Sequence, residues 1–478
     1  MALPAVLRAQ LAALVGERWI KDDPVSLFTY RSDGLTLHEA EPAAIVFPGT
    51  TAELSAAVKI LAGAGIPFLP RGAGTGLSGG AVPAPGAVLL EMARFREISD
   101  VDAVSRTVMV GPGVVNDQLS RHVRSLGLHF VPDPSSQKAC TIGGNVGENS
   151  GGPHTLKYGV TVNHILGLEV VLPDGEVVEL GGRTWDTPGP DLTGLFVGSE
   201  GTFGIATRIC CRLSPLPEKA ITLLAVFDSA EDACRGVSGI IARGIVPAAL
   251  ELMDRVVIGA VEQAYHLGFP PRAGAVLIAE IEGLTEGLDE EAAQVEDILR
   301  AQRARETRRA RSDEERLLIW KARKQAFGAI GRLAPSYYTQ DGVIPRSRLP
   351  EVLAKIYAIA RRYELTVGNV FHAGDGNLHP LLLYDPRRAE QVQAVLAAGH
   401  EILEACLAVG GALSGEHGIG LEKSSMMGSL FNGEDLEAMK RVRAVFNPTE
   451  ILNPGKIFPS PGKCADAPFI RAKSGIVA

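Results

Sequence analysis

Three glycine-rich loops limit the folds open to this chain more than any other feature. They are 70–80 (PRGAGTGLSGG), 141–152 (TIGGNVGENSGG) and 198–205 (GSEGTFGI), and each adjoins a predicted strand. Successive backbone N–H groups in such loops bind anions, and glycine lets a ligand approach the backbone closely. Three loops in order therefore favour an extended, phosphate-containing cofactor, although any single loop is also open to interpretation as a tight structural turn.

The first loop matches the G-x-G-x-x-G pattern from Gly74 to Gly79. In a Rossmann site a helix opens directly after that pattern, so that the pyrophosphate meets the helix N-terminus. Here Pro83, Pro85 and Gly86 follow, and no helix can begin cleanly among them. We therefore expect a phosphate-binding loop that does not belong to a Rossmann fold.

The elements around the loops predict how the chain divides. Residues 45–70 predict strand, helix and strand, with the helix capped by Thr50 and Glu53. Residues 169–180 predict a hairpin around Asp174-Gly175. A chain of 478 residues is too long for one core. We expect three parts, namely a cofactor-binding domain at 1–217, a separate α+β domain at 218–430 and a C-terminal tail at 431–478.

Composition narrows the functional classes. The net charge is −8, which disfavours nucleic-acid binding. Arginines gather in 300–311, but acidic residues interleave, so we interpret the segment as a solvated helix and loop; a nucleic-acid patch is the alternative. The six cysteines, Cys464 included, form no C-x-x-C pair, so we expect buried thiols and no iron–sulfur cluster of the usual spacing.

The membrane is expected to be reached only indirectly. No apolar run approaches the roughly 20 residues that span a bilayer. The N-terminal segment 1–19 has the pattern of an amphipathic helix and not of a secretory signal. We expect a cytoplasmic protein that contacts the inner face of the cell membrane, if at all, through partner subunits.

Four motifs together resemble one flavoprotein signature. They are PRGAGTGLSGG at 70–80, PDPSS at 132–136, GSEG at 198–201 and NPGK at 453–456. In combination they are similar to the FAD-binding signature of the vanillyl-alcohol-oxidase (PCMH-type) flavoproteins. Within that family the chain most resembles the branch that holds the glycolate oxidase D subunit and the D-lactate and D-2-hydroxyglutarate dehydrogenases, from about residue 20 to about residue 465.

The resemblance implies an α+β fold and a cofactor. It implies a PCMH-type FAD-binding domain of two α/β subdomains, an inserted α+β cap domain and a C-terminal helical tail that returns to the FAD domain. Some relatives attach the flavin to a histidine in the first loop; this loop has none, so we expect non-covalent FAD. The residues expected to contact FAD are Arg71, Gly72, Gly74, Thr75, Gly76, Ser78, Gly79, Pro132, Asp133, Ser135, Gly143, Gly144, Asn145, Asn149, Glu200, Gly201, Gly204, Ile205 and Asn453.

A second site is predicted around two histidines. Residues 366–383 predict a hairpin with Asp375-Gly376 as its two-residue turn, and this register places His372 opposite His379. Directly opposed residues share a face about 5 Å apart, so their imidazoles can hold one metal ion. Glu416, on a glycine-flanked loop, is the expected third ligand, and such a set suits Zn²⁺ or Mn²⁺. The resemblance assigns the same three ligands.

Two further residues complete the expected site. The resemblance makes His417 the proton acceptor, which spacing alone does not assign; a hydrogen bond from His417 to a neighbouring site residue is the alternative. Arg323 shares a helix face with Trp320 and Phe327, and an arginine on an inward apolar face needs a buried anion. A structural salt bridge explains that placement equally; the resemblance favours binding of the substrate carboxylate.

The expected reaction is FAD-dependent oxidation of a small 2-hydroxy acid, glycolate in first place and D-lactate as the alternative. Relatives that take dicarboxylates carry Lys and Asn where this chain has Thr339 and Leu381, which favours a small monocarboxylate. An alternative function, of a different class, is that of a flavin-binding electron-transfer subunit without its own substrate site. The resemblance also implies a flavin-domain partner and an iron–sulfur partner that pass the electrons on.

Overall fold

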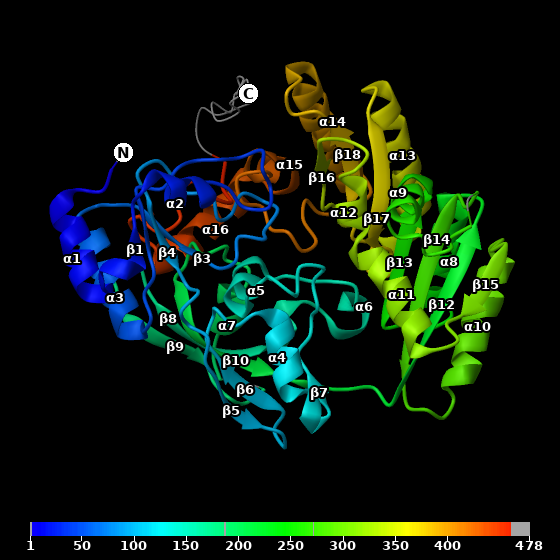
Figure 1. Ribbon diagram of the computed structural model, residues 1–478, viewed down its shortest axis with the longest axis horizontal. Helices are drawn as coiled ribbons and strands as arrows, with labels where there is room; N and C mark the ends of the chain where they lie inside the picture. Colours follow the sequence, from blue (N-terminus) through cyan, green and yellow to red (C-terminus); the bar gives the residue numbers. More distant parts are fainter. Residues whose placement is uncertain (1, 186–187, 271, 460–478) are drawn as a thin grey trace. The chain divides into compact units, whose positions relative to one another are not determined.

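The computed structural model describes residues 2–185, 188–270 and 272–459, and within them the chain forms two compact units (Figure 1). Unit 1 contains the chain up to Gly151, Val160–Leu216 and the described residues from Glu416 onward; unit 2 contains Gly152–Gly159 and Pro217–Gly415. The three-part division expected from the sequence stays a prediction. Cys464 and the end of the expected tail lie outside the described residues.

The first sheet of unit 1 carries the first glycine loop. Its order is β1 (Ile20–Lys21), β2 (Ala44–Val46), β4 (Val88–Glu91) and β3 (Phe68–Arg71), with the last three parallel. Helix α3 (Thr51–Gly63) connects β2 to β3, and α1 (Ala5–Val15) packs against it. The predicted strand–helix–strand unit is confirmed. The structure describes every residue from β3 to β4, and no helix lies between these two strands. The prediction that the first loop does not belong to a Rossmann fold is therefore confirmed.

The cap of α3 differs in one detail from the expected capping box. Thr50 Oγ1 accepts a hydrogen bond from the Glu53 N–H at 3.1 Å, as expected. The Glu53 carboxylate, however, accepts from the N–H of Gly49 at 2.6 Å, one residue before the cap. It also accepts from Arg94 at 3.2 Å, and this arginine draws the carboxylate away from the Thr50 backbone.

The second sheet of unit 1 is antiparallel. Its order is β5 (Ile98–Asp102), β6 (Thr107–Val110), β10 (Ile205–Arg212), β8 (Ile165–Val171) and β9 (Val177–Gly181). The predicted hairpin is confirmed, since Glu169 pairs with Glu179 across β8 and β9. The sheet's buried side chains form one core with those of α4 (Asn116–Val123), α5 (Ile142–Glu148) and α7 (Leu192–Phe196). A short pair, β7 (Leu128–His129) and β11 (Ser214–Pro215), adjoins it.

The C-terminal segment belongs to unit 1, as expected. Helices α15 (Met427–Leu430) and α16 (Gly433–Phe446) lead to a turn in which Leu452 bridges Phe68 of β3. The Asn453 N–H donates to the Phe68 carbonyl at 2.8 Å. The end of the described chain is therefore fixed beside the strand that enters the first glycine loop.

Unit 2 is one antiparallel sheet with helices on both faces (Figure 1). The strand order is β15 (Glu306–Arg309), β12 (Lys219–Phe227), β14 (Ala275–Gly283), β13 (Ala249–Asp254), β17 (Thr366–His372), β18 (Pro380–Tyr384) and β16 (Ser336–Thr339). One face packs against α8 (Ala230–Ala242), α10 (Leu288–Ala301), α13 (Leu349–Arg362) and α14 (Ala389–Leu407). The other packs against α9 (Arg255–Tyr265), α11 (Asp313–Lys324) and α12 (Ala326–Ile330). The predicted α+β class is confirmed.

The prediction for the arginine-rich segment 300–311 is partly wrong. It continues from α10 into edge strand β15, not into a loop, because its backbone pairs with β12. Its side chains are matched by acids: Arg300 pairs with Glu296, Arg305 with Asp228, and Arg309 with Glu296. Among the helices that the structure describes, none combines the length and apolar character that a membrane crossing requires.

Candidate active site

The hairpin that carries the two histidines forms, but its predicted register is wrong. Asn369 pairs with Pro380, and the ladder ends with His372 opposite Asn377. The predicted two-residue turn is replaced by the four residues 373–376. The register shift is two residues, and a shift of two keeps every side chain on its face. His372 and His379 thus remain on one face as diagonal neighbours, with ring centroids 5.2 Å apart.

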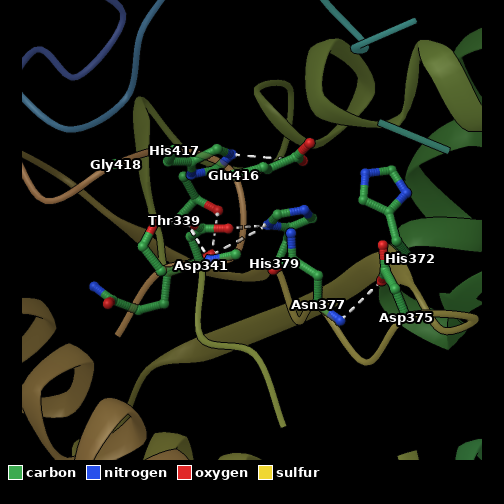
Figure 2. Close-up of polar contacts among 12 residues, drawn as sticks. Thr339, Asp341, His372, Asp375, Asn377, His379, Glu416, His417 and Gly418 are labelled. Atoms are coloured by element: carbon green, nitrogen blue, oxygen red, sulfur yellow. Dashed lines mark hydrogen bonds and ion pairs between the residues drawn. The ribbon is translucent and has the colours of Figure 1, made fainter. Parts of the chain in front are cut away.

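The two imidazoles meet a carboxylate. His372, His379 and Glu416 each offer a ligand atom, and these atoms all lie within 4.8 Å of one another. Figure 2 shows the three side chains pointing toward one another. Both histidines are buried, and Glu416 has 11% of its side chain exposed. The three predicted metal ligands are therefore brought together, in a geometry open to one ion.

A second group shares one of these histidines. Asp341, His379 and His417 satisfy the same distance criterion. The Asp341 carboxylate already accepts hydrogen bonds from the Ser414 hydroxyl at 2.5 Å and the Gly415 N–H at 3.1 Å. Asp341 therefore holds the loop that presents Glu416, and its capacity as a ligand is partly used.

His417, a member of this second group, also lies next to Glu416. Its Nε2 is 4.0 Å from Glu416 Oε1, and 13% of its side chain is exposed. A histidine close to the ligand atoms, yet in contact with solvent, is suited to accept a substrate proton and pass it on. Its assignment as the proton acceptor stays a prediction.

Arg323 is buried in the last turn of α11, facing the sheet. Its Nε donates to Glu251 Oε2 at 2.5 Å, and its Nη2 lies 3.4 Å from His372 Nδ1. Its Nη1 is shielded from solvent and has no hydrogen-bond partner among the described residues. The structural salt bridge is therefore present, and one donor of the fork is left for another anion.

The two positions that bear on substrate size are neighbours. Thr339 on β16 pairs directly with Leu381 on β18, and both are buried. The Thr339 hydroxyl donates to the Gln340 carbonyl at 3.3 Å, and Leu381 belongs to the apolar core of unit 2. Neither side chain brings a positive charge or an amide to this part of the sheet.

The glycine loops and the tail converge in unit 1. A Cβ on Gly72 would lie 2.5 Å from Thr141 Oγ1, so the first two loops touch. Asn116 Nδ2 donates to the Pro132 carbonyl at 3.1 Å and to Asn145 Oδ1 at 3.0 Å. Asn453 Nδ2 donates to the Gly80 and Glu200 carbonyls. Most of the predicted FAD contacts thus lie on loops tied to one another.

Backbone conformation supports the same assignment at three of these positions. Gly74, Gly79 and Gly201 have φ of 66°, 77° and 65°, in the left-handed region. Glycine adopts it without the steric cost that a side chain imposes. Two predicted contacts, Asn149 and Glu200, also have positive φ (53° and 52°) despite their side chains.

Arg71 is occupied structurally. Its Nη1 donates to the Ala81 carbonyl at 3.2 Å and its Nη2 to the Ser32 carbonyl at 2.9 Å. The bond to Ala81 joins the two ends of the first loop, the bond to Ser32 ties the loop to the segment before it, and a direct contact from Arg71 to a phosphate stays a prediction. Of the other predicted positions, Ser135 is exposed, Gly204 packs on Val170 and Phe196, and Ile205 belongs to the apolar core, so their contacts with FAD stay predictions.

Several buried polar atoms near the glycine loops have no hydrogen-bond partner among the described residues. Ser78 Oγ, Glu148 Oε2 and Asn453 Oδ1 are shielded from solvent and have no hydrogen-bond partner among the described residues. Burial, with the nearby carboxylates of Glu200 and Asp33, raises the pKa of Glu148 well above its ordinary value. Burial lowers the pKa of Lys456 to about 8. Orphaned donors and acceptors of this kind fit a large polar cofactor such as FAD.

Several residues of both sites were not found from the sequence: Glu148, Glu251, Asp341 and Lys456. One signal was available for Glu251. It stands inside the apolar strand 249–254 (ALELMD), and carboxylates are almost never fully buried unless paired. The others lie in loops or helix ends, where no periodicity marks them.

Two family models match the chain. The FAD binding domain matches residues 42–181, and the FAD linked oxidases, C-terminal domain, matches residues 216–457. The chain therefore belongs to the FAD-linked oxidases and is an FAD-dependent oxidoreductase.

Similar proteins of named activity show which branch of the family the chain resembles most. Glycolate oxidase subunit GlcD of Escherichia coli (strain K12) is 46% identical over 440 residues, 92% of this chain and 88% of that protein. The GlcD subunit of Bacillus subtilis (strain 168) is 38% identical over 453 residues, 95% of this chain and 96% of that protein. A probable mitochondrial D-lactate dehydrogenase of Danio rerio is 32% identical over 422 residues, 87% and 84% of the two chains. The resemblance stated from the motifs is confirmed.

A solved structure supports the fold. p-Cresol methylhydroxylase with substrate bound superposes with a TM-score of 0.80 at 17% identity, over 95% of this chain and 97% of that one. Identity at that level speaks for the fold alone. The predicted PCMH-type fold is confirmed.

Proposed function

We propose that this enzyme oxidises glycolate to glyoxylate. The observation that carries the proposal is the group of buried His372, buried His379 and partly exposed Glu416, with the unpartnered Nη1 of Arg323 in the same site. A pure electron-transfer subunit has no use for such a group. The relatives whose names state an activity, glycolate oxidase subunits and D-lactate dehydrogenases, act on small 2-hydroxy acids.

The donor set fits a divalent ion. Two imidazoles and one carboxylate with open positions suit Zn²⁺ or Mn²⁺. When bound, the ion supplies polarisation of the substrate hydroxyl and FAD supplies hydride acceptance. His379 Nδ1 lies 3.4 Å from the Gln340 carbonyl, which favours a proton on Nδ1 and leaves Nε2 for the ion.

The chain's own residues would bind and deprotonate the substrate. Arg323 Nη1 would donate to the substrate carboxylate, while Glu251 fixes the other side of the guanidinium. His417 would accept the hydroxyl proton at Nε2. Burial of both histidines and Arg323 would keep water from the reacting atoms and strengthen these charge interactions.

The pair Thr339 and Leu381 supports a small monocarboxylate. A second substrate carboxylate would need a cation or an amide at this part of the sheet, and these two side chains supply neither. D-Lactate, which also has one carboxylate, is the second candidate because of the D-lactate dehydrogenase relative.

Stopped-flow absorbance tests the substrate. We expect glycolate to bleach the flavin of the purified protein faster than D-lactate at equal concentration. Faster bleaching by D-lactate would reassign the substrate, and bleaching by neither would contradict oxidation of a hydroxy acid.

FAD is proposed to be non-covalent, because the loop 70–80 contains no histidine. Acid precipitation should release all flavin into the supernatant. A flavin peak that stays with the denatured polypeptide would contradict this proposal.

Electrons are proposed to leave through partner subunits, one with a flavin domain and one with iron–sulfur clusters. The similar Escherichia coli and Bacillus subtilis proteins are named as subunits. The five described cysteines are all buried, and none forms a C-x-x-C pair with another. The isolated chain should reduce artificial dyes but react slowly with oxygen, and a pull-down from native extract should recover an iron–sulfur protein and some membrane. Recovery of the chain alone, with fast glycolate-dependent peroxide release, would contradict the proposal.

A further inference from the structure

One buried carboxylate joins the two halves of the proposed site. Glu251 lies on β13 with no exposed surface, inside a strand that pairs with β14 on one side and β17 on the other. In the antiparallel register its direct partner on β17 is His372. Side chains at directly paired positions share one face and lie next to each other. The fold therefore places this carboxylate against a proposed metal ligand.

The two oxygens of Glu251 are divided between two residues. Oε1 is 2.7 Å from His372 Nδ1, and Oε2 accepts from Arg323 Nε at 2.5 Å. An ionised carboxylate can only accept hydrogen bonds. His372 must therefore carry its proton on Nδ1, and its lone pair lies on Nε2, where a metal ion can take it.

The Glu251 carboxylate also separates two hydrogen-bond donors that face each other. Arg323 Nη2 and His372 Nδ1 are 3.4 Å apart, and both are donors when Nδ1 is protonated. Two facing donors repel unless an acceptor lies between or beside them. Glu251 accepts from both groups, and it holds the guanidinium so that the unpartnered atom is Nη1.

We propose that Glu251 is a positioning residue for both metal and substrate. Through Oε1 it sets the tautomer of His372, and through Oε2 it sets the orientation of the Arg323 fork. Loss of Glu251 would disturb metal affinity and substrate affinity together, although it touches neither ligand. The proposal rests on the proposed function for the identity of the two ligands.

Glu251→Gln is the sharpest variant, because an amide keeps the shape but has only one accepting oxygen. If that oxygen stays with Arg323 Nε, the NH₂ group faces His372 and favours the tautomer with its proton on Nε2. If the amide turns, its NH₂ group faces Arg323 and repels it. Either way one of the two functions fails.

The direct readout is the tautomer of His372, from ring-nitrogen NMR of the FAD-loaded, chelator-treated full chain labelled with ¹⁵N-histidine. The His372 signal is assigned by its loss in His372→Gln. We expect the Nδ1–H tautomer in the wild type and a shift toward Nε2–H, or a mixture, in Glu251→Gln. A wild type in the Nε2–H tautomer would overturn the proposal whether or not the enzyme oxidises glycolate. An unchanged His372 signal in the variant would overturn it when the KM for glycolate is also unchanged, because the amide would then disturb neither partner.

Two functional readouts follow. Zn²⁺ affinity, from competition with a chelator, should fall about 10–100-fold in Glu251→Gln. The KM for glycolate should rise as the Arg323 fork loosens, while bound FAD stays at the wild-type ratio. Wild-type Zn²⁺ affinity together with wild-type KM would overturn the proposal. Absence of Zn²⁺ binding from the wild type would instead contradict the proposed function and leave the NMR result to decide on Glu251.

Glu280→Gln is the matched control. Glu280 is equally buried, on the adjacent strand β14, and accepts hydrogen bonds from Trp320 Nε1 at 2.6 Å and Arg316 Nη2 at 2.7 Å on the same helix as Arg323. It has the same chemistry without a contact to His372. We expect it to leave the His372 tautomer and the Zn²⁺ affinity unchanged. An equal effect in both variants would reduce Glu251 to a general packing role and overturn the proposal.

Discussion

Two buried carboxylates, Glu280 in unit 2 and Glu91 in unit 1, have pKa values that are shifted in opposite directions. In unit 2, burial alone would raise the pKa of Glu280, but hydrogen bonds from His154 and Arg316 outweigh it and lower that pKa far below its ordinary value. In unit 1, burial raises the pKa of Glu91 to about 8 and that of Asp33 to about 6. Glu91 lies 4.0 Å from Arg71 Nε, too far for a hydrogen bond, so the cation offsets only part of the cost.

The difference separates buried carboxylates that are paired by hydrogen bonds with charged side chains from buried carboxylates that are not. In unit 2, Glu251 and Glu280 are paired with arginine, histidine and tryptophan side chains, which fixes their geometry before any ligand arrives. Unit 1 leaves acids, a serine and an asparagine with unmatched atoms around the glycine loops. A polar cofactor that is bound there would gain those interactions, which accounts for the retention of such costly groups.

Disabling the metal group gives the largest expected effect and tests whether the two units work independently. His379→Ala should lower kcat by about 10²–10⁴-fold, since the proposed hydroxyl activation and proton transfer both depend on the proposed metal ligands. Bound FAD, measured by absorbance after release, should stay at the wild-type ratio. His400→Ala is the control, because that histidine is exposed on α14 and contacts Glu404. Loss of FAD in His379→Ala alone would break the comparison.

The next effect concerns the two arginines of α11, each paired with a buried glutamate. Arg323→Lys keeps the charge but loses the two-pronged hydrogen bonding of the guanidinium. The lost interaction with the substrate carboxylate is on the order of 1.5–3 kcal/mol, so kcat/KM should fall about 10–100-fold. Arg316→Lys should leave kcat/KM near the wild-type value, because Arg316 forms an ion pair with Glu280 and is partly exposed. Equal losses would mean that Arg323 is a structural ion pair only.

The sequence predicted the elements of this fold well where periodicity and loop chemistry agree. The unit around α3 and the hairpin β8–β9 formed as expected, since caps, alternation and glycine turns all act locally. The motif set led to the correct family because its loops combine in a pattern that composition alone does not produce.

The sequence failed where distant strands decide the geometry. The Asp375-Gly376 pair suggested a two-residue turn, but β13 and β18 both pair with β17 and fix a register two residues away. Glu251 contacts His372 because β13 pairs with β17, and Asp341 accepts a hydrogen bond from Ser414, 73 residues along the chain. Such long-range pairings leave no mark on local sequence spacing.

A smaller effect tests the raised pKa of Glu91. Its folded-state pKa of about 8 lies above the ordinary value of 4.5, so its contribution to stability is complete below pH 4.5 and is lost as pH rises through 8. Relative to Glu91→Gln, the wild type should lose about 1–3 kcal/mol of unfolding free energy between about pH 5.5 and pH 9. Urea unfolding followed by flavin fluorescence measures this in unit 1. A constant difference across that range would contradict the raised pKa.

The smallest effect belongs to ion pairs at the surface, where water screens both partners. Arg305 Nη1 lies 3.0 Å from Asp228 Oδ1, but the two side chains are 50% and 72% exposed. Such pairs contribute about 0–1 kcal/mol, because solvent weakens the attraction and two long side chains lose freedom. Arg305→Gln should therefore lower the free energy of unfolding by less than about 1 kcal/mol, and less still at high salt. Glu280→Gln should cost more under the same conditions, because it leaves Arg316 without its charged partner. If Arg305→Gln cost as much as Glu280→Gln, the number of matched charges and not their burial would govern the stability of unit 2.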